Sequence, residues 1–170
     1  MKLDLQSLKR IHIVGIGGAG MSAIARVLKG RGMEVRGSDQ KEGRLVAALR
    51  DEGIPVMVGH TEENVTGADL VLASSAVPDD NVELVAARKQ GIPVMRRPEF
   101  LSPLTEGYEV IAVAGAHGKT TVTGMLVTIL LEAGLDPTYI VGGVVENLGT
   151  NGQAGCSRLF VIEADEYRNT

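Results

Sequence analysis

Short apolar runs alternate with longer segments of helical period along the first hundred residues, and this alternation constrains the fold more than any other feature. "IHIV" at 11–14 and "EVRGS" at 34–38 are each followed by a stretch whose apolar residues repeat as on one face of a helix. The pattern continues through "DLVLA" at 69–73, a helical stretch at 81–91 and "IPVM" at 92–95. Because strands joined by helical crossovers run parallel, we predict an α/β fold with a Rossmann-like parallel sheet.

A second series of elements follows a break at 96–107, which contains two prolines and a Glu-Gly pair. The strong strand pattern "YEVIAVAG" at 108–115 comes next, and a helical stretch follows it. We therefore predict two domains, a Rossmann-like domain over 1–104 and a partial P-loop ATPase α/β domain over 105–170. The second domain has too few predicted strands to close a doubly wound sheet, so we expect the chain to be part of a longer protein.

Composition and charge exclude several classes of protein. A net charge of -4 and a pI near 5.4 argue against a general nucleic-acid-binding protein, which needs a broad basic face. Cys156 is the sole cysteine, so no internal disulfide can form and a reducing cytoplasm fits. The apolar N-terminal stretch is interrupted by His12 and by glycines, and no apolar run reaches the roughly 18 residues of a membrane span. We expect a cytoplasmic protein without membrane insertion, and its oligomeric state stays open.

The first glycine turn, "GIGGAG", follows a predicted strand and opens a predicted helix. Asp39 ends the second strand 19 residues after Gly20, a spacing that matches the dinucleotide fingerprint. Glycines allow a tight turn and a close approach of backbone amides to a diphosphate at the helix N-terminus. The candidate residues are Gly15, Gly17, Gly18, Ala19 and Gly20. The spacing leaves NAD, FAD and UDP-sugars open as ligands, and a turn that only joins strand to helix is the non-functional alternative.

Other polar residues stand where predicted strands end. Since ligands of open parallel sheets bind at the carboxyl ends of the strands, we expect these side chains to converge on one crevice. They are Ser38 and Asp39, Ser74 and Ser75, and Arg96 and Arg97. The alternatives are turn or helix caps for the serines and a solvated surface pair for the arginines.

The second glycine loop, "GAHGKTT", also lies between an apolar strand and a helix, the context that a nucleoside-triphosphate loop requires. Val113 stands where the general pattern has its first glycine. We expect Lys119 to contact the β- and γ-phosphates of ATP and the Thr120 hydroxyl to bind Mg²⁺. The candidate ATP-binding residues are Gly115, Ala116, His117, Gly118, Lys119, Thr120 and Thr121.

A metal held by one hydroxyl also needs carboxylate ligands. Glu163 and Asp165 end a predicted strand that could neighbour the one before the second glycine loop, and alternate strand residues share a face. We predict that Glu163 and Asp165 are the candidate metal partners of Thr120, with a pair of solvated strand-end acids as the alternative. His12 and His60 are more typical of packed or surface residues than of ligands.

These residues together form motifs that resemble the Mur ligase family over essentially the whole chain. The motifs are "HIVGIGGAGMSAIA" at 12–25, "GSD" at 37–39, "SSAVPDDN" at 74–81, "AVAGAHGKTT" at 112–121, "GGVVENLGTN" at 142–151 and "VIEADE" at 161–166. The resemblance implies that the N-terminal domain binds the UDP part of a sugar nucleotide and the second domain binds ATP. Two phosphate sites would then serve two different nucleotides.

The chemistry that the resemblance implies is the ATP-dependent joining of L-alanine to UDP-N-acetylmuramate. The lactyl carboxylate takes the γ-phosphate of ATP to form an acyl phosphate, and the amine of L-alanine then displaces phosphate, a step of peptidoglycan biosynthesis. Lys119 would contact the ATP phosphates, and Thr120 and Glu163 the metal ion, as catalytic residues. The UDP moiety would lie on the Gly15 to Gly20 turn with Ser38, Asp39, Ser74 and Ser75. The amino-acid site would lie beyond Thr170, so we expect no ligation by residues 1–170 alone.

Two departures from the family pattern leave alternatives open. Ala116 stands where the family's ATP loop usually has Thr, and Tyr167 and Arg168 stand where the alanine-adding pattern has Ser-Asp. With a Tyr at this position, the motif resembles that of the ligases that recycle murein peptides. Those enzymes join the same sugar nucleotide to a ready-made peptide. Outside the family, an NAD-binding Rossmann oxidoreductase or sensor would leave the second glycine loop unexplained.

Overall fold

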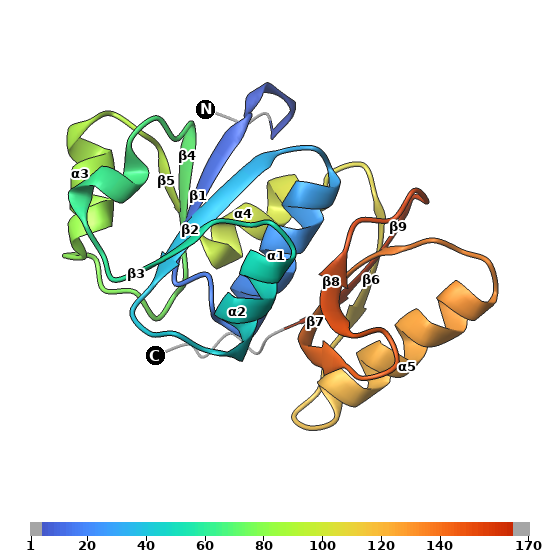
Figure 1. Ribbon diagram of the computed structural model, residues 1–170. Coiled ribbons are helices and arrows are strands. Elements are labelled where there is room, and N and C mark those ends of the chain that lie inside the picture. The colour runs from blue at the N-terminus through green and yellow to red at the C-terminus, as the bar shows by residue number, and fades with distance from the viewer. Residues whose placement is uncertain (1–4, 165–170) are drawn as a thin grey trace.

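A computed structural model of the protein describes residues 5–164 and contains two β-sheets (Figure 1). The first sheet has the order β3-β2-β1-β4-β5, and all of its strands are parallel. Its strands are β1 (Arg10–Val14), β2 (Glu34–Asp39), β3 (Val56–Val58), β4 (Leu70–Ala73) and β5 (Val94–Arg96). This order and direction confirm the prediction of a Rossmann-like parallel sheet.

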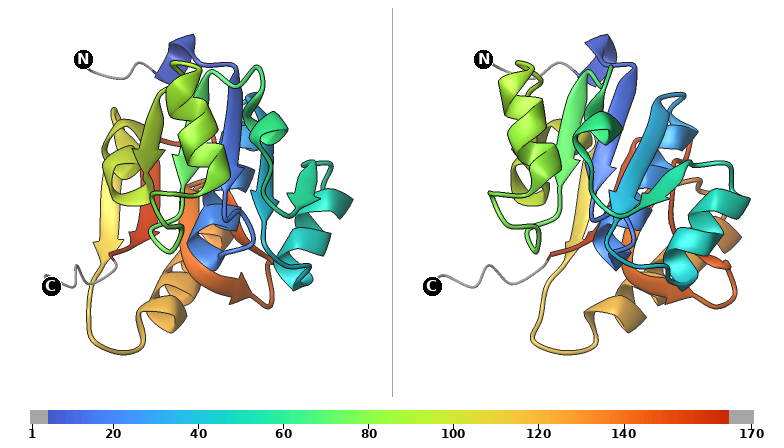
Figure 2. Two further views of the ribbon diagram at one scale, coloured as in Figure 1. Left: turned by 90° about the vertical axis from the view of Figure 1, so that its left-hand side faces the viewer. Right: turned by 60° about the vertical axis from the view of Figure 1, so that its left-hand side comes forward.

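Helices cover both faces of the first sheet (Figure 2). Alternate residues of β1 point to opposite faces, so Ile11 and Ile13 pack in one core cluster and Val14 in another. The first cluster contains residues of α1 (Ala19–Gly30), α2 (Arg44–Asp51) and α4 (Arg97–Thr105). The second contains residues of α3 (Val82–Lys89) and of the short 3-10 helix η2 (Glu62–Val65). A further 3-10 helix, η1 (Leu5–Ser7), precedes β1.

The second sheet has the order β6-β9-β7-β8 and is mixed, since β7 pairs in parallel with β9 and antiparallel with β8. Its strands are β6 (Glu109–Val113), β7 (Thr138–Val145), β8 (Thr150–Gln153) and β9 (Leu159–Glu163). Tyr139 and Val161 pack against Val127 of helix α5 (Lys119–Glu132) on one face. Ile140 and Phe160 on the other face belong to the same core cluster as α1. Helix α1 therefore lies between the two sheets (Figure 1).

The structure contains elements that the sequence patterns did not predict. Helix α4 occupies the two-proline segment, where we had placed only a break, because Pro98 falls in the first helical turn, which needs no amide donor there. Strand β8 lies inside the Gly/Asn-rich segment 142–158 and is held in strand conformation by its pairing with β7. Asn81 caps the N-terminus of α3, since its side chain accepts a hydrogen bond from the Glu83 amide at 2.9 Å.

The two sheets divide between α4 and β6, close to the boundary expected near residue 104. Their separation into two domains stays a prediction, because one core cluster extends across both of them. Over residues 5–164, none of the helices combines the length and apolar character needed to cross a membrane.

Candidate functional site

The first glycine turn is held in place by backbone hydrogen bonds to the end of β2. The amides of Gly15 and Ile16 both donate to the Ser38 carbonyl, at 2.8 and 3.1 Å. The Gly17 amide donates to the Asp39 carboxylate at 2.9 Å. Gly15 has a φ of +77°, a conformation that glycine adopts more readily than any other residue. The turn that would receive a diphosphate therefore has a fixed conformation before any ligand binds.

Side chains from three other segments border this turn closely. A Cβ atom on Gly17 would lie 2.8 Å from the Asp39 carboxylate oxygen, and one on Gly15 would lie 3.0 Å from the Ser74 Cβ. A Cβ atom on Gly20 would lie 2.7 Å from the Arg97 guanidinium carbon. The structure thus gathers Asp39, Ser74 and Arg97 around the start of α1, where the helix dipole also favours an anion. Sequence reasoning had weighed Arg97 as half of a solvated surface pair.

Other predicted residues have structural partners. Ser74 Oγ accepts a hydrogen bond from the Ala76 amide at 3.3 Å, so Ser74 caps a turn, as the alternative interpretation expected. Ser75 is exposed on the same loop. Arg96 donates to the carbonyls of Ser74 and Val77 at 2.8 and 2.6 Å. Arg96 therefore fixes the loop after β4 and is not a solvated surface residue.

The Ser38 hydroxyl is fully buried and donates to Glu83 at 2.6 Å, so it is not accessible to a ligand. Glu83 is itself buried and also accepts from His12 Nε2 at 3.0 Å and from Asn64 at 2.5 Å. Burial alone would raise the pKa of Glu83, but the hydrogen bonds from His12, Asn64 and Ser38 lower this pKa from 4.5 to about 2. Sequence patterns gave no signal for this buried network. Ser38 links it to the first glycine turn, because the Ser38 hydroxyl donates to Glu83 and the Ser38 carbonyl accepts from the turn.

The second glycine loop is more open. Residues 114–118 are exposed, and Gly118, with a φ of +76°, is the N-cap of α5 without a side-chain capping bond. Lys119 Nζ donates to the Gly115 carbonyl at 2.6 Å, so the lysine folds back over its own loop. His117 and Thr121 are exposed beside it. The loop therefore presents a cation and a helix N-terminus to solvent, a combination suited to phosphate groups.

The predicted metal pair lies together. Thr120 Oγ1 donates to Glu163 at 3.3 Å, across the start of α5 and the end of β9, and the Gly142 amide donates to the other Glu163 oxygen at 2.8 Å. A Cβ atom on Gly142 would lie 2.6 Å from the Glu163 carboxylate, so the glycine leaves room for it. No group of three His, Cys, Asp or Glu side chains that could hold a metal occurs within residues 5–164. One hydroxyl and one carboxylate fit Mg²⁺, which keeps several waters and takes substrate phosphate oxygens. Asp165 and Glu166 lie outside the described residues.

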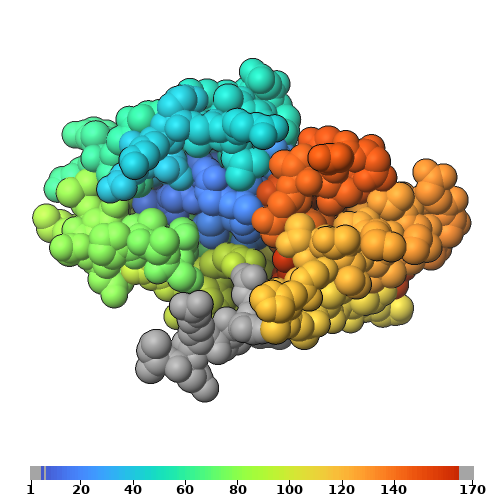
Figure 3. Space-filling view, turned by 90° about the horizontal axis from the view of Figure 1, so that it is seen from below, coloured from blue at the N-terminus to red at the C-terminus, as the bar shows by residue number. Residues whose placement is uncertain are grey.

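A hollow at the start of α1 extends toward the second glycine loop. Seen from below (Figure 3), the blue start of α1 is recessed between the cyan segment after β2, the green segment after β4 and the orange hairpin of β7 and β8. A cavity of about 420 Å³ joins Ala19 at the start of α1 to Gly143 and Val144 of β7, with Arg44 on its wall. Since Gly143 also borders Thr120 of the second loop, the hollow extends from the first glycine turn toward the second glycine loop.

A family model described as "Mur ligase family, catalytic domain" matches residues 10–109, which is more than half of the chain. The chain belongs to the Mur ligase family. Among curated members, proteins named UDP-N-acetylmuramate--L-alanine ligase from a Bradyrhizobium species and from Frankia casuarinae are 52% and 47% identical over 94% and 95% of the chain. The chain spans about a third of their length, 34% in each case.

Solved Mur ligase structures have the same arrangement of both sheets. The UDP-N-acetylmuramate-alanine ligase of Thermotoga maritima superposes with a TM-score of 0.84 at 37% identity, over 92% of this chain and 37% of that one. A UDP-N-acetylmuramate:L-alanyl-gamma-D-glutamyl-meso-diaminopimelate ligase from Neisseria meningitides also gives 0.84, at 35% identity, over 95% of this chain and 54% of that one. The fold is therefore common to alanine-adding and peptide-adding Mur ligases.

Proposed function

We propose that this chain is the nucleotide-binding part of an ATP-dependent ligase that joins L-alanine to UDP-N-acetylmuramate. The observation that carries the proposal is the presence of two glycine loops of different construction, with a cavity that runs from the start of α1 toward the second loop. One loop is fixed and bordered by an acid and an arginine, and the other is open beside a Lys–Thr–Glu group. A dinucleotide-binding protein has no use for the second loop.

In this proposal the first loop binds the UDP moiety. The Gly17 and Gly18 amides already have acceptors at Asp39 and Gly15, so the amides of Ala19 and Gly20 in the first turn of α1 contact the diphosphate. Asp39 accepts from ribose hydroxyls. Ser74 and Ser75 line the other side of the crevice. Ser38 contributes through its carbonyl, which holds the turn, because its hydroxyl is bound to Glu83. The muramyl group then extends through the cavity toward β7.

The second loop binds ATP. Backbone amides of residues 115–120 surround the phosphates, and Lys119 leaves the Gly115 carbonyl to neutralise the β- and γ-phosphates. Thr120 and Glu163 hold Mg²⁺, which would supply charge neutralisation on the phosphate oxygens. Gly142 orients the Glu163 carboxylate through its amide. The protein thus acts mainly by positioning the lactyl carboxylate in line with the γ-phosphorus.

The proposed reaction proceeds in two steps. A lactyl carboxylate oxygen bonds to the γ-phosphorus while the bond to ADP breaks, which gives an acyl phosphate. The L-alanine amine then bonds to the acyl carbon, inorganic phosphate leaves with the electron pair, and the amine loses its proton. Curated relatives named for L-alanine support this acceptor over the murein-peptide alternative.

Thermal-shift titration tests the proposal on residues 1–170. UDP-N-acetylmuramate at a hundredfold excess over its dissociation constant should stabilise the chain by about 2.7 kcal/mol, whereas NADH should produce no shift. Stabilisation by NADH alone would contradict the proposal. To separate the two acceptors, ADP release by the complete ligase is compared with L-alanine and with the tripeptide; faster release with the tripeptide would favour recycling.

A further inference from the structure

A cavity of about 420 Å³ lies between helix α2, the start of α1 and the β7–β8 hairpin. Ala19 of α1, Arg44 of α2 and Gly143 of β7 are among the residues that line it. Its volume falls in the range of roughly 300–1,000 Å³ that is typical of small-molecule sites. The cavity can therefore receive a sugar group that extends from the first glycine turn toward the second glycine loop.

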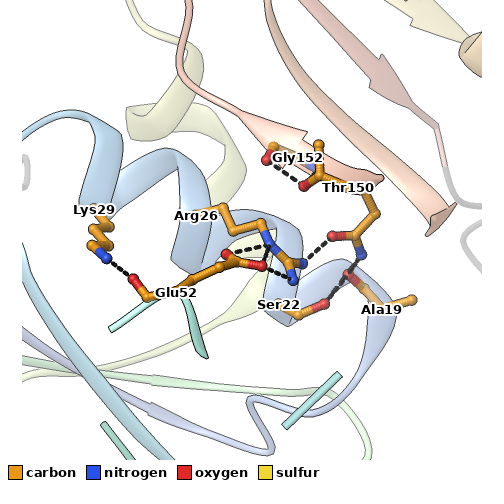
Figure 4. A network of polar contacts seen from close by, with 8 residues as sticks. Ala19, Ser22, Arg26, Lys29, Glu52, Thr150 and Gly152 are labelled. Carbon is orange, nitrogen blue, oxygen red and sulfur yellow. Dashed lines mark hydrogen bonds and ion pairs between the residues drawn. The ribbon is translucent and has the colours of Figure 1, made fainter. Parts of the chain in front are cut away.

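Arg26 and Arg44 are the charged side chains among the described residues that line this cavity. The Arg26 guanidinium donates to the Glu52 carboxylate at 2.7 Å and to the Asn151 amide oxygen at 2.5 Å, so its charge is neutralised within the fold (Figure 4). Arg44 is exposed, and within residues 5–164 its side chain forms neither a hydrogen bond nor an ion pair. The cavity wall thus carries one positive charge that the described residues do not offset.

The place of Arg44 in the fold does not explain its charge. Arg44 is the first residue of α2, where the helix dipole disfavours a cation, and the first turn of α2 contains no acid. Glu42, in the preceding loop, binds Arg50 in the last turn of the helix, at 2.8 Å. An arginine that stabilises neither its helix nor a neighbouring acid, and that lines a cavity, is suited to an anionic ligand.

UDP-N-acetylmuramate has two kinds of anionic group, the diphosphate and the carboxylate of its lactyl group. In the proposed function the first turn of α1 binds the diphosphate, and the Arg97 guanidinium lies there beside Gly20. The carboxylate must instead reach the second glycine loop. The cavity leads in that direction, because a Cβ atom on Gly143 would lie 3.3 Å from Thr120 Cγ2. The carboxylate is therefore the anion that enters the part of the cavity lined by Arg44.

We propose that Arg44 is a specificity-determining residue that binds the lactyl carboxylate of the sugar nucleotide, an inference that rests on the proposed function. A carboxylate and a triphosphate repel each other, so each needs its own cation before the two can meet. Lys119 serves the triphosphate from the second loop, and Arg44 serves the carboxylate from α2. A guanidinium that donates to one carboxylate oxygen leaves the other oxygen available to bond to the γ-phosphorus. A sugar nucleotide without this carboxylate gains nothing from Arg44.

Isothermal titration of residues 1–170 with two sugar nucleotides tests this assignment. UDP-N-acetylglucosamine is the matched probe, because it has the same diphosphate but lacks the lactyl carboxylate. We expect the unmodified chain to bind UDP-N-acetylmuramate about tenfold more tightly than the probe, the effect of one charge-assisted hydrogen bond. In Arg44→Gln this ratio should fall to about one, because binding of UDP-N-acetylmuramate alone weakens. In Arg44→Lys, which keeps the charge, the ratio should be intermediate.

Lys41→Gln is the matched control, since Lys41 is an exposed cation of the same loop and is not among the described residues that line the cavity. Its ratio should equal that of the unmodified chain. The urea midpoint of Arg44→Gln should not fall, because no other described residue depends on the Arg44 side chain for a bond. A lower midpoint would show that Arg44 acts through the fold and would overturn the assignment.

Three binding results would also overturn it. They are a ratio near one in the unmodified chain, an unchanged ratio in Arg44→Gln, and an equal loss of both sugar nucleotides, which would move Arg44 to the diphosphate. Each of these leaves the proposed function intact as long as UDP-N-acetylmuramate binds. Absence of UDP-N-acetylmuramate binding by the unmodified chain would contradict the proposed function as well.

Discussion

The two glycine loops have similar sequences but differ in how they are supported. In the first loop, four amides have acceptors on β2 or within the turn itself, and the surrounding side chains are in contact with the glycines. In the second loop, residues 114–118 are exposed, and the lysine bonds to its own loop. The first loop is preorganised for a ligand, and the second has a conformation that a ligand must complete.

The difference follows from what surrounds each loop. The first lies at the centre of a five-stranded sheet, where β2, β4 and α4 all contribute neighbours. The second follows β6, which is an edge strand of its sheet over the described residues. A preorganised loop loses little conformational entropy on binding, whereas an open loop loses more.

The largest expected effect comes from removing the support beneath the first loop. Glu83→Gln places an amide among three donors, so the free energy of unfolding should fall by about 3 kcal/mol at pH 7. Since the pKa of Glu83 is lowered from 4.5 to about 2 on folding, its ionised form stabilises the fold above about pH 4.5, and this contribution is lost as the pH falls toward 2. Urea unfolding at pH 7, 4.5 and 3 measures both effects.

Exposed Glu62 supplies the control for that experiment, because Glu62→Gln should change stability by no more than about 0.5 kcal/mol at any of these pH values. The difference between the two variants should shrink as the pH is lowered. Equal stability of both variants at pH 7 would show that the buried carboxylate does not support the turn.

A somewhat smaller effect is expected at the second loop. Lys119→Ala removes a charged donor to the phosphates and should weaken binding of a non-hydrolysable ATP analogue about 30- to 100-fold, or about 2–3 kcal/mol. Binding of UDP-N-acetylmuramate alone should stay within about twofold, since Lys119 belongs to the open loop. Calorimetric titration provides both constants, and Lys89→Ala, an exposed lysine on α3, is the control. A loss of sugar-nucleotide binding in Lys119→Ala would contradict the proposal that the two loops bind different nucleotides.

Adjacent glycines of the first loop sharpen the comparison further. A Cβ atom on Gly17 would lie 2.8 Å from Asp39 and 2.9 Å from Val46, whereas one on Gly18 would meet nothing closer than 3.5 Å. Gly17→Ala should therefore lower the free energy of unfolding by about 2 kcal/mol, and Gly18→Ala by about 1 kcal/mol or less. Urea unfolding of the two variants measures the difference. Equal losses would mean that the turn can relax and is not rigid.

The smallest effect concerns the backbone of the second loop. Gly118 has a φ of +76°, so Gly118→Ala should cost about 1 kcal/mol, and Gly118→Asn should cost less because Asn tolerates this conformation. Denaturation of both variants, with and without the ATP analogue, checks the order. If alanine and asparagine behaved alike, the left-handed conformation would not be needed in the free protein.

Sequence patterns predicted the elements whose periodicity reflects burial, and missed those held by tertiary contacts. The β1–α1–β2 unit and the pairing of Thr120 with Glu163 both follow from local spacing and strand direction. Strand β8, "TNGQ", has no apolar alternation, because one of its residues is a glycine pressed against α1 and another is the buried Asn151. The contact between Ser38 and Glu83 could not be predicted from the sequence either, since the two residues meet only through the packing of α3 on the sheet.

One helix shared between two sheets makes their stabilities inseparable. Ile140 and Phe160 of the second sheet belong to the same apolar cluster as Ile24 and Leu28 of α1, so pulling the sheets apart would expose that surface to water. Heating should therefore melt the whole chain in a single calorimetric peak, with equal calorimetric and van't Hoff enthalpies. Any movement that brings the two proposed nucleotide sites together must therefore take place elsewhere than between these sheets.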